Sequence, residues 1–479
     1  MENYKIANIK TGISNGMDVK KINRVHFVGI GGIGVSALGR LFLAMGKKVT
    51  GSDLRASKIT QDLERLGAVI FIGHSQANIR KPELVVYSED VAKGQGIIEV
   101  EIAKQQNIQT LTYAQTLGLL MEGKFGVAVS GTNGKSTTTA MLGLILDAAG
   151  FDPTVVIGTK LSSQNENDGF QANARLGDSK IFVAEADEYF RHMLNLHPSM
   201  IILTNVAEDH LDYYRDLAEI KEAFTQFVKS LPDGGVLIYN ADDEHAVQIG
   251  RAFGGHKFTF GIHHYADLQA MNMKVSLGKQ SFDLHYKDHL IGKFELAVPG
   301  KFNVSNALGA VLAAIRLGAD VSVIEQVLKE FAGTWRRFEI LGKTGKATIV
   351  TDYGHHPAAI TATLSAAKEF YPQKKILLVF QPHHRNRTQK LFGDFVEALR
   401  NADDVIIPEI FDVAGREHGE DISSANLVSE LTKLGVRARF APNLAETENM
   451  ARQEADNFDM IIFMGAGDID QLARKIAHG

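Results

Sequence analysis

The sequence predicts an α/β protein built from parallel sheets, and three observations carry this prediction. Two apolar segments run directly into glycine-rich loops and then into helix-forming stretches, at 24–39 and 125–146. Short apolar strands alternate with helical stretches along most of the chain, as βαβ units require. Polar and charged residues follow several strands at the point where each strand ends. In a parallel sheet such residues gather at one edge, where α/β proteins bind their ligands.

Composition narrows the class of protein. A length of 479 residues predicts two to four domains, and 45% hydrophobic with 22% charged residues is typical of a globular chain. The net charge of −5 argues against a general nucleic-acid surface, and the absence of cysteine excludes disulfides and thiolate chemistry. No apolar stretch is as long as a membrane span, and residues 1–23 lack the apolar core of a signal peptide. We therefore expect a flexible lead-in over 1–23 and a cytoplasmic protein.

The segment 125–139 predicts a phosphate-binding loop. An apolar strand ends before Gly131, and Gly134, Lys135 and Ser136 follow at the start of a helix. Glycines let backbone N–H groups close on an anion, and the helix N-terminus adds its dipole. Lys135 is expected to reach the β- and γ-phosphates and Ser136 to hold Mg²⁺. A ligand-free glycine turn is the weaker alternative, although the usual first glycine of such loops is replaced by Val129.

A second glycine loop lies near the N-terminus. Gly29, Gly31 and Gly34 fit the pattern G-x-G-x-x-G after the strand 24–28, and Asp53 ends the next strand. This layout is typical of a dinucleotide-binding βαβ unit and by itself indicates NAD. The separate ATP-type loop weakens that interpretation, because any nucleoside diphosphate ester presents the same pyrophosphate. Helix packing without a ligand is a third alternative.

Acidic residues and a histidine follow two strands of the central region. The strand 180–184 precedes Glu185 and Glu188, and the strand 200–203 precedes His210. These groups should emerge at the same sheet edge as the phosphate loop. Carboxylates and a neutral imidazole there can complete a Mg²⁺ shell with the loop serine. Glu188 competes with Glu185 for this role.

Further polar residues lie toward the C-terminus. Asn303 opens a helix, where it either meets a nucleotide or caps the helix. Arg336 and Arg337 form a pair suited to phosphate binding. The expected organisation is a lead-in at 1–23, a Rossmann-like domain at 24–124, a P-loop ATPase-type central domain at 125–333 and a Rossmann-like C-terminal domain at 334–479.

Together these motifs resemble the Mur ligase family, from Val25 to Ile476. The resemblance rests on motifs in family order: His26-Phe-Val-Gly-Ile-Gly-Gly-Ile-Gly, Gly51-Ser-Asp, Gly131-Thr-Asn-Gly-Lys-Ser-Thr-Thr-Thr, Glu185-Ala-Asp-Glu-Tyr, Thr204-Asn, Asp209-His-Leu-Asp, Trp335-Arg-Arg-Phe-Glu, Asp352-Tyr-Gly-His-His-Pro, Gln381-Pro-His and Met464-Gly-Ala-Gly-Asp. Several motifs in order are far more specific than any single one.

The resemblance implies an ATP- and Mg²⁺-dependent ligase of peptidoglycan precursor synthesis. It would join the carboxylate of UDP-N-acetylmuramate to L-alanine through an acyl phosphate, without a nucleic-acid partner. A relative that attaches a preformed peptide to UDP-N-acetylmuramate has the same plan and is the alternative. The resemblance also leaves room for a homodimer.

The resemblance also assigns site residues by position. Those implied for the UDP-sugar are Gly29, Gly31, Gly32, Gly34 and Asp53. Those implied for ATP are Gly131, Thr132, Asn133, Gly134, Lys135, Ser136, Thr137, Asn303, Arg336, Arg337 and Asp352. Lys135, Glu185 and His210 would be catalytic, the metal would bind Ser136, Glu185 and His210, and the carboxylate and amino acid would face His355, Arg385 and Arg387.

The chain departs from the family pattern at three places. The phosphate loop has Asn133 and Ser136 where this branch usually has histidine and threonine. Phe302 replaces the usual histidine before Asn303, and His384 replaces an arginine, with Arg385 as its expected substitute. These differences concern recognition of the base and the amino acid rather than the type of reaction.

Overall fold

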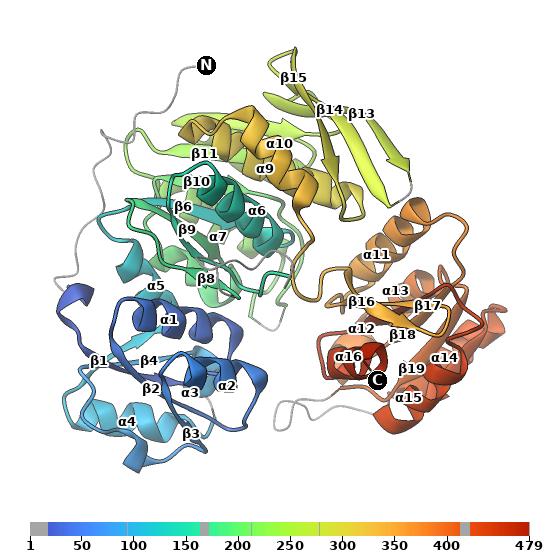
Figure 1. The fold of residues 1–479 in the computed structure, drawn as a ribbon, viewed down its shortest axis with the longest axis horizontal. Coiled ribbons are helices and arrows are strands. Elements are labelled where there is room, and N and C mark those ends of the chain that lie inside the picture. The colour runs from blue at the N-terminus through green and yellow to red at the C-terminus, as the bar shows by residue number, and fades with distance from the viewer. Residues whose placement is uncertain are drawn as a thin grey trace. The chain divides into compact units, whose positions relative to one another are not determined.

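A computed structural model describes residues 18–92, 94–162, 172–211, 213–276, 278–411 and 422–478. The chain forms two compact units. The first comprises Met1–Met273, Phe282–Glu295 and Phe302–Phe331, and the second comprises Lys274–Ser281, Leu296–Lys301 and Ala332–Gly479. Three β-sheets with flanking helices make up the described chain, which confirms the predicted α/β class (Figure 1).

The first sheet has five parallel strands in the order β3-β2-β1-β4-β5. Its strands are β1 (Arg24–Val28), β2 (Lys48–Asp53), β3 (Val69–Ile72), β4 (Leu84–Tyr87) and β5 (Gln109–Thr112). Its helices are α1 (Ile33–Ala44), α2 (Lys58–Arg65), α3 (Glu89–Ala92), α4 (Ile97–Gln105) and α5 (Tyr113–Met121). The strand order reverses between β1 and β4, so the glycine loop after β1 lies at the switch point where such sheets bind ligands.

A buried carboxylate lies beneath this glycine loop. Glu99 accepts hydrogen bonds from the Ser52 hydroxyl at 2.6 Å and from Asn78 Nδ2 at 2.7 Å, and His26 Nε2 lies 3.0 Å away. The Ser52 carbonyl in turn accepts from the Gly29 N–H at 2.8 Å. Burial opposes ionisation of Glu99, but the contacts with its neighbours, His26 first, outweigh burial and lower its pKa. The network therefore fixes the start of the loop.

The second sheet has ten strands in the order β15-β14-β13-β12-β11-β10-β6-β9-β7-β8. Its strands are β6 (Phe125–Ser130), β7 (Thr154–Val156), β8 (Ala174–Arg175), β9 (Ile181–Ala186), β10 (Met200–Leu203), β11 (Val236–Asn240), β12 (His256–Gly261), β13 (Leu268–Ser276), β14 (Lys279–Tyr286) and β15 (His289–Leu296). The phosphate-loop strand β6 lies between β10 and β9 and is parallel to both. The carboxyl ends of these three strands therefore meet.

The helical segments of this region are α6 (Lys135–Ala148), the 3₁₀ segment η4 (Tyr189–Asn195), α7 (Leu217–Lys229), α8 (Glu244–Ala252), α9 (Lys301–Leu317) and α10 (Val321–Glu330). The sequence at 257–261, 272–276, 281–286 and 293–297 predicts four short strands and is compatible with antiparallel pairing. The first of them, β12, is instead parallel to β11, and β13 is nine residues long. The polar, glycine-rich stretch 159–180 predicts a loop or hairpin over the site, and its residues 163–171 lie outside the described part of the chain.

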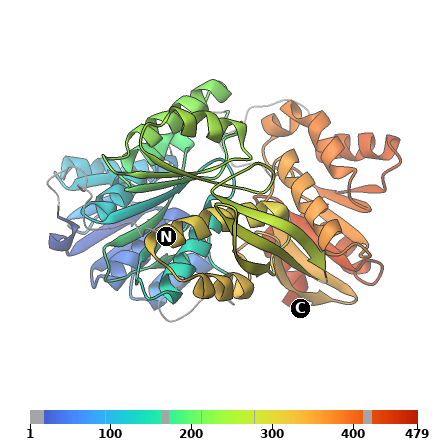
Figure 2. The same ribbon diagram turned by 90° about the horizontal axis from the view of Figure 1, so that it is seen from above.

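The third sheet has six strands in the order β16-β17-β21-β18-β19-β20, with only β16 antiparallel to its neighbour among the described pairs. Its strands are β16 (Glu339–Thr344), β17 (Ala347–Asp352), β18 (Ile376–Phe380), β19 (Asp404–Pro408), β20 (Ala438–Ala441) and β21 (Met460–Met464). Its helices are α11 (Pro357–Phe370), α12 (Arg385–Lys390), α13 (Phe392–Leu399), α14 (Ser424–Lys433), α15 (Leu444–Gln453) and α16 (Ile469–His478). Leu377 and Leu378 belong to separate cores on opposite faces of the sheet. Helices flank this sheet (Figure 2).

The N-terminal boundary differs from the prediction. Residues 1–17 of the expected lead-in lie outside the described residues, but Val19–Lys21 form a short 3₁₀ turn. Ile22 is buried in the core of the first unit, so the fold begins before Arg24. No helix in the described ranges has the length and apolar character needed to cross a bilayer.

We predict that Glu99→Ala destabilises the first sheet by about 3 kcal/mol at pH 7, the scale for breaking a buried charge network. Because folding lowers the pKa of Glu99, this stabilisation is present above the unfolded-state pKa of about 4.3 and is lost as the pH falls toward the folded-state value. Hydrogen exchange of β1 and β4 peptides measures this sheet within the full chain. Glu101→Ala, an exposed change on the same helix, is the control, and equal protection in both variants contradicts the prediction.

Candidate active site

The loop after β6 needs glycine at two positions. Gly131 and Gly134 have φ of +136° and +86°, a region that L side chains rarely adopt. A Cβ at Gly131 would collide with the Thr204 hydroxyl, and one at Gly134 would collide with the Asn306 amide oxygen from α9. The backbone thus turns into α6 with its N–H groups at the carboxyl edge of the sheet, as an anion-binding loop requires.

The segment after β10 holds this loop in place. The Asn133 N–H donates to Asn205 Oδ1 at 2.9 Å, and the Thr132 N–H donates to the Asn205 carbonyl at 3.0 Å. The Thr204 hydroxyl donates to the Asn133 carbonyl at 2.6 Å. Because these bonds fix both sides of the loop, its shape is set before any ligand binds.

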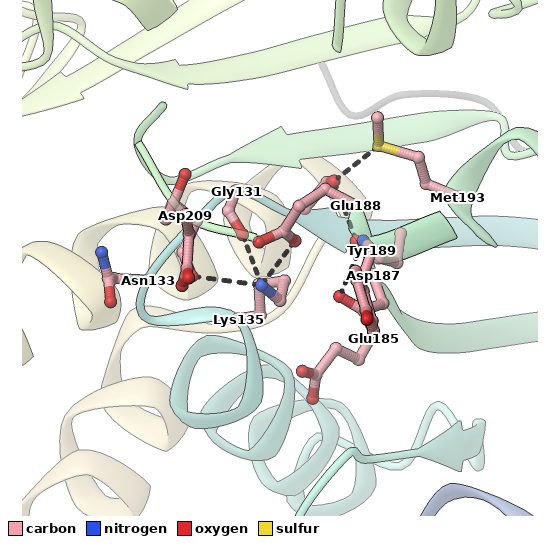
Figure 3. A network of polar contacts seen from close by, with 12 residues as sticks. Gly131, Asn133, Lys135, Glu185, Asp187, Glu188, Tyr189, Met193 and Asp209 are labelled. Atoms are coloured by element: carbon pink, nitrogen blue, oxygen red, sulfur yellow. Dashed lines mark hydrogen bonds and ion pairs between the residues drawn. The ribbon is translucent and has the colours of Figure 1, made fainter. Parts of the chain in front are cut away.

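The Lys135 ammonium lies at the centre of the site. It donates to the Gly131 carbonyl at 2.7 Å and the Thr132 carbonyl at 3.1 Å, and it pairs with Glu188 Oε2 at 2.6 Å (Figure 3). Burial opposes its charge, but the nearby carboxylates, with Glu188 the strongest, outweigh burial and raise the pKa of Lys135. Lys135 is therefore a cation that bridges the loop and the turn after β9.

Glu188 of this ion pair also belongs to a group of three potential cation ligands. Asp187, Glu188 and His210 each bring one donor atom within 4.8 Å of the others, and His210 Nε2 lies 3.9 Å from Glu188 Oε1. Glu188 Oε1 is buried and has no hydrogen-bond partner in the described chain. Burial raises the pKa of Glu188 to about 8 despite the opposing charge of Lys135. A buried oxygen that lacks a donor, among further anionic oxygens, is suited to a cation.

Glu185 lies apart from this set. Its Oε2 accepts from the Gly158 N–H at 2.8 Å, and its carboxylate also accepts a hydrogen bond from the Ser136 hydroxyl. Burial raises the pKa of Glu185. The predicted ligands Ser136, Glu185 and His210 are thus divided, with Glu185 beside Ser136 and His210 beside Glu188.

The turn that carries Glu188 has unusual backbone geometry. Phe190 and Arg191 have φ of 51° and 56°, and His210 opposite them has φ of 52°. The Tyr189 ring stacks on the His210 imidazole with centroids 4.2 Å apart, and the Tyr214 hydroxyl donates to the Glu188 carbonyl at 2.5 Å. Left-handed backbone at non-glycine residues costs of order 1–3 kcal/mol each and clusters at functional sites.

Asn303 is buried on the first turn of α9. Its Oδ1 accepts from Asn306 Nδ2 at 3.3 Å, and Asn306 is the residue packed against Gly134. The structure thus links Asn303 to the phosphate loop through Asn306.

The first glycine loop is hydrogen-bonded to Asp53, the acid that ends β2. The Gly31 N–H donates to Asp53 Oδ2 at 2.9 Å, so the Asp53 carboxylate lies on the loop. Gly29 has φ of +77°, and Gly32 precedes the first turn of α1. The ring of Tyr113 packs against Gly34.

In the second unit, two residues predicted to contact the nucleotide, Arg336 and Asp352, form hydrogen bonds with backbone groups of the same unit. Arg336 is buried and donates to the carbonyls of Gly465 and Gly467, and burial lowers its pKa. The Asp352 carboxylate accepts from the backbone N–H groups of Phe338 at 2.9 Å and Gly354 at 2.7 Å. Arg337, by contrast, is exposed, with its guanidinium over the Tyr353 ring.

The predicted amino-acid residues follow β17 and β18. His355 Nδ1 lies 3.1 Å from the Tyr353 carbonyl, and Arg385 donates to the Ile422 carbonyl and lies 3.4 Å from Glu409. Arg387 is half-buried on the same turn. Burial, aided by neighbouring positive groups, lowers the pKa of His383 to about 3, so this imidazole is neutral.

Sequence reasoning missed three features of the site. The pairing of Lys135 with Glu188, the bonds from Thr204 and Asn205 to the loop, and the contact of Asn306 with Gly134 all join residues far apart in the chain. The position of Thr204 and Asn205 directly after a strand was a signal for the second. The i, i+3 spacing of Asn303 and Asn306 was a signal for the third.

These features define a nucleotide-binding α/β protein of the P-loop class. Three sequence models match the chain: "Mur ligase family, catalytic domain" over 24–125, "Mur ligase middle domain" over 129–314 and "Mur ligase, glutamate ligase domain" over 336–467. The chain belongs to the Mur ligase family.

Individual relatives extend this likeness over nearly the whole length. The UDP-N-acetylmuramate–L-alanine ligase of Caldanaerobacter subterraneus subsp. tengcongensis is 37% identical, with 96% of this chain and 98% of that one covered. The ligase of the same name from Pelobacter propionicus is 39% identical, with 94% and 96% covered. The solved UDP-N-acetylmuramate–alanine ligase of Thermotoga maritima has a TM-score of 0.80 at 29% identity, with 95% and 98% covered. A murein peptide ligase from Psychrobacter arcticus has a TM-score of 0.68 at 25% identity, with 94% and 97% covered.

We predict that Lys135→Ala lowers ATP-dependent turnover by at least about 10²-fold, the scale for losing one contact to transition-state charge. Lys180→Ala, a change at the exposed lysine directly before β9, should leave turnover unchanged. Steady-state phosphate release measures both, with thermal unfolding as the check on folding. Turnover of Lys135→Ala within a few-fold of the unaltered protein contradicts the role.

Proposed function

We propose that this ligase joins the carboxylate of UDP-N-acetylmuramate to the amino group of L-alanine in peptidoglycan precursor synthesis. The observation that carries the proposal is the pair of nucleotide-type glycine loops in one compact unit, in a chain similar over nearly its whole length to ligases of that name. One loop suits the pyrophosphate of a sugar nucleotide and the other suits the phosphates of ATP. An enzyme that uses both ATP and a sugar nucleotide would work in the cytoplasm, and we propose that location.

The ATP phosphates lie on the loop after β6 in this proposal. Residues 131–137 surround them, and Lys135 turns from Glu188 to the β- and γ-phosphates. Asn303 faces the nucleotide in this proposal. It is hydrogen-bonded to Asn306, which packs against Gly134 of the phosphate loop and so holds this turn of the helix beside the loop. From the second unit, Arg337 is the better phosphate ligand, since the guanidinium of Arg336 is already bound to backbone carbonyls.

The residues present fit Mg²⁺. Ser136 with Glu185 offers oxygens beside the phosphate loop, and His210 with Glu188 offers a second set, in which Glu188 Oε1 lacks a donor. An imidazole ligand must be neutral and is unusual for Mg²⁺, which prefers oxygen. When bound, the ion would neutralise charge on the transferring phosphoryl group.

The reaction itself needs an activated carboxylate. A carboxylate is a poor electrophile, so its oxygen attacks the γ-phosphorus of ATP, and an acyl phosphate and ADP form. The neutral amine of alanine then attacks the acyl carbon, phosphate leaves, and the amine loses a proton to a base. Lys135 stabilises the phosphoryl charge in the first step, while His355, Arg385 and Arg387 receive the carboxylate and amino acid.

The UDP-sugar binds the first glycine loop in this proposal. The loop lies at the switch point of its sheet, and its glycines allow the pyrophosphate to approach the N-terminus of α1. Gly29, Gly31, Gly32 and Gly34 make up this surface. Asp53 already accepts from the Gly31 N–H and so defines the loop edge.

Attachment of a preformed peptide is the second candidate, favoured by the likeness to the murein peptide ligase of Psychrobacter arcticus. Phosphate release with UDP-N-acetylmuramate and ATP, scanned over alanine, serine, glycine and a tripeptide, separates the two. We expect alanine to give the highest kcat/KM. Turnover with the tripeptide but not with alanine overturns the proposal.

For the metal, we predict that Glu188→Gln and His210→Ala each raise the Mg²⁺ concentration for half-maximal activity by at least about tenfold. Glu185→Ala should lower turnover as well, and in all three variants UDP-sugar affinity should stay nearly unchanged. Mn²⁺, which accepts nitrogen ligands more readily, should replace Mg²⁺ well. Calorimetry with Mn²⁺ and ATP gives a direct binding measurement.

Glu208→Gln is the matched control, because Glu208 is exposed and lies two residues before His210. An unaltered metal requirement in both Glu188→Gln and His210→Ala excludes this ligand set.

A further inference from the structure

Helix α5 lies between the two halves of the first unit. It follows β5 of the first sheet, and it packs against η4, the segment that directly follows Glu188. The approach is close, because a Cβ at Gly118 would collide with the Asn195 carbonyl. The first residue of α5 is Tyr113.

Tyr113 lies on the third glycine of the first loop. A Cβ at Gly34 would lie 3.0 Å from Tyr113 Cζ and 3.4 Å from its hydroxyl oxygen. The absence of a side chain at Gly34 therefore lets the phenol reach the loop.

The same phenol is close enough to the second site to respond to its charges. Burial first, and then the negative charges of Glu185 and Asp187, raise the pKa of Tyr113. The phenol is thus a neutral hydrogen-bond donor at any working pH. Its hydroxyl has no hydrogen-bond partner among the described residues.

Contacts from both sides fix the start of α5. Thr112 caps the helix and accepts from the Gln115 N–H at 3.2 Å. Glu89, which follows β4, forms an ion pair at 2.9 Å with His192 of η4. Burial alone would raise the pKa of Glu89, but the contact with His192, supported by Thr112, outweighs it and lowers the pKa. The phenol is therefore held at a defined place rather than on a mobile loop.

We propose that the Tyr113 hydroxyl binds the acyl end of the sugar nucleotide, the part that carries the reacting carboxylate from the first glycine loop to the ATP loop. This inference rests on the proposed function. A ligand anchored by its pyrophosphate on one loop and phosphorylated at the other must cross the space between Gly34 and the carboxylates. A neutral donor suits an anionic carboxylate there, because the neighbouring Glu185 and Asp187 repel it.

The test compares two ligands and two tyrosines. Tyr113→Phe removes only the hydroxyl, so UDP-N-acetylmuramate should bind about tenfold more weakly, the scale of one lost hydrogen bond to a charged group. UDP alone and ATP should bind as before. The control is Tyr239→Phe, since Tyr239 also packs on a glycine, Gly250, and burial also raises its pKa.

Calorimetry with each ligand, together with KM and kcat for the sugar nucleotide, gives the readout. Unchanged UDP-N-acetylmuramate affinity in Tyr113→Phe overturns the inference, and so does an equal loss for UDP, which would mean that the phenol only supports the loop. If the unaltered protein itself fails to bind UDP-N-acetylmuramate, the proposed function fails instead.

Discussion

The ion pair between Lys135 and Glu188 is the contact on which the candidate site depends. Both groups are buried, and removal of either would leave an uncompensated charge at a cost of several kcal/mol. One lysine faces three carboxyl groups, those of Glu185, Asp187 and Glu188, and burial still raises the pKa of both glutamates, so the site has a deficit of positive charge. A nucleotide that draws Lys135 toward its phosphates would increase this deficit. In the proposed function, a divalent cation bound with the nucleotide would offset this deficit.

The strained backbone near this pair follows from the same requirement. To bring Glu188 and His210 to one point, two turns from different strands must both point inward, and Phe190, Arg191 and His210 adopt left-handed conformations as a result. The stacking of Tyr189 on His210 and the bond from Tyr214 to the Glu188 carbonyl offset part of that cost. The aromatic residues of this region therefore contribute to the geometry of the acidic groups and not only to the core.

The sequence was sufficient to predict the α/β class, the order of the motifs along the chain and both glycine loops, because glycine and strand patterns are local signals. It could not show how residues at the ends of separate strands pair. Glu185 lies in β9 and Glu188 lies just before η4, three residues on, yet Glu188 faces Lys135 while Glu185 faces Gly158 and Ser136. Only the turn after β9 decides this, and its left-handed residues are not glycines. Likewise, nothing local indicates that both oxygens of Asp352 accept hydrogen bonds from backbone N–H groups.

Packing explains why two nucleotide-type loops can serve one bond-forming reaction. A single hydrophobic cluster contains Phe27 and Phe42 beside the first sheet together with Phe182 and Phe224 beside the second. Interiors of this kind are close-packed and transmit displacement rather than absorb it. The two loops are thereby held in one unit, and α5 crosses between them with Tyr113 at its first residue. The third sheet has two cores of its own, so its fold does not depend on this cluster.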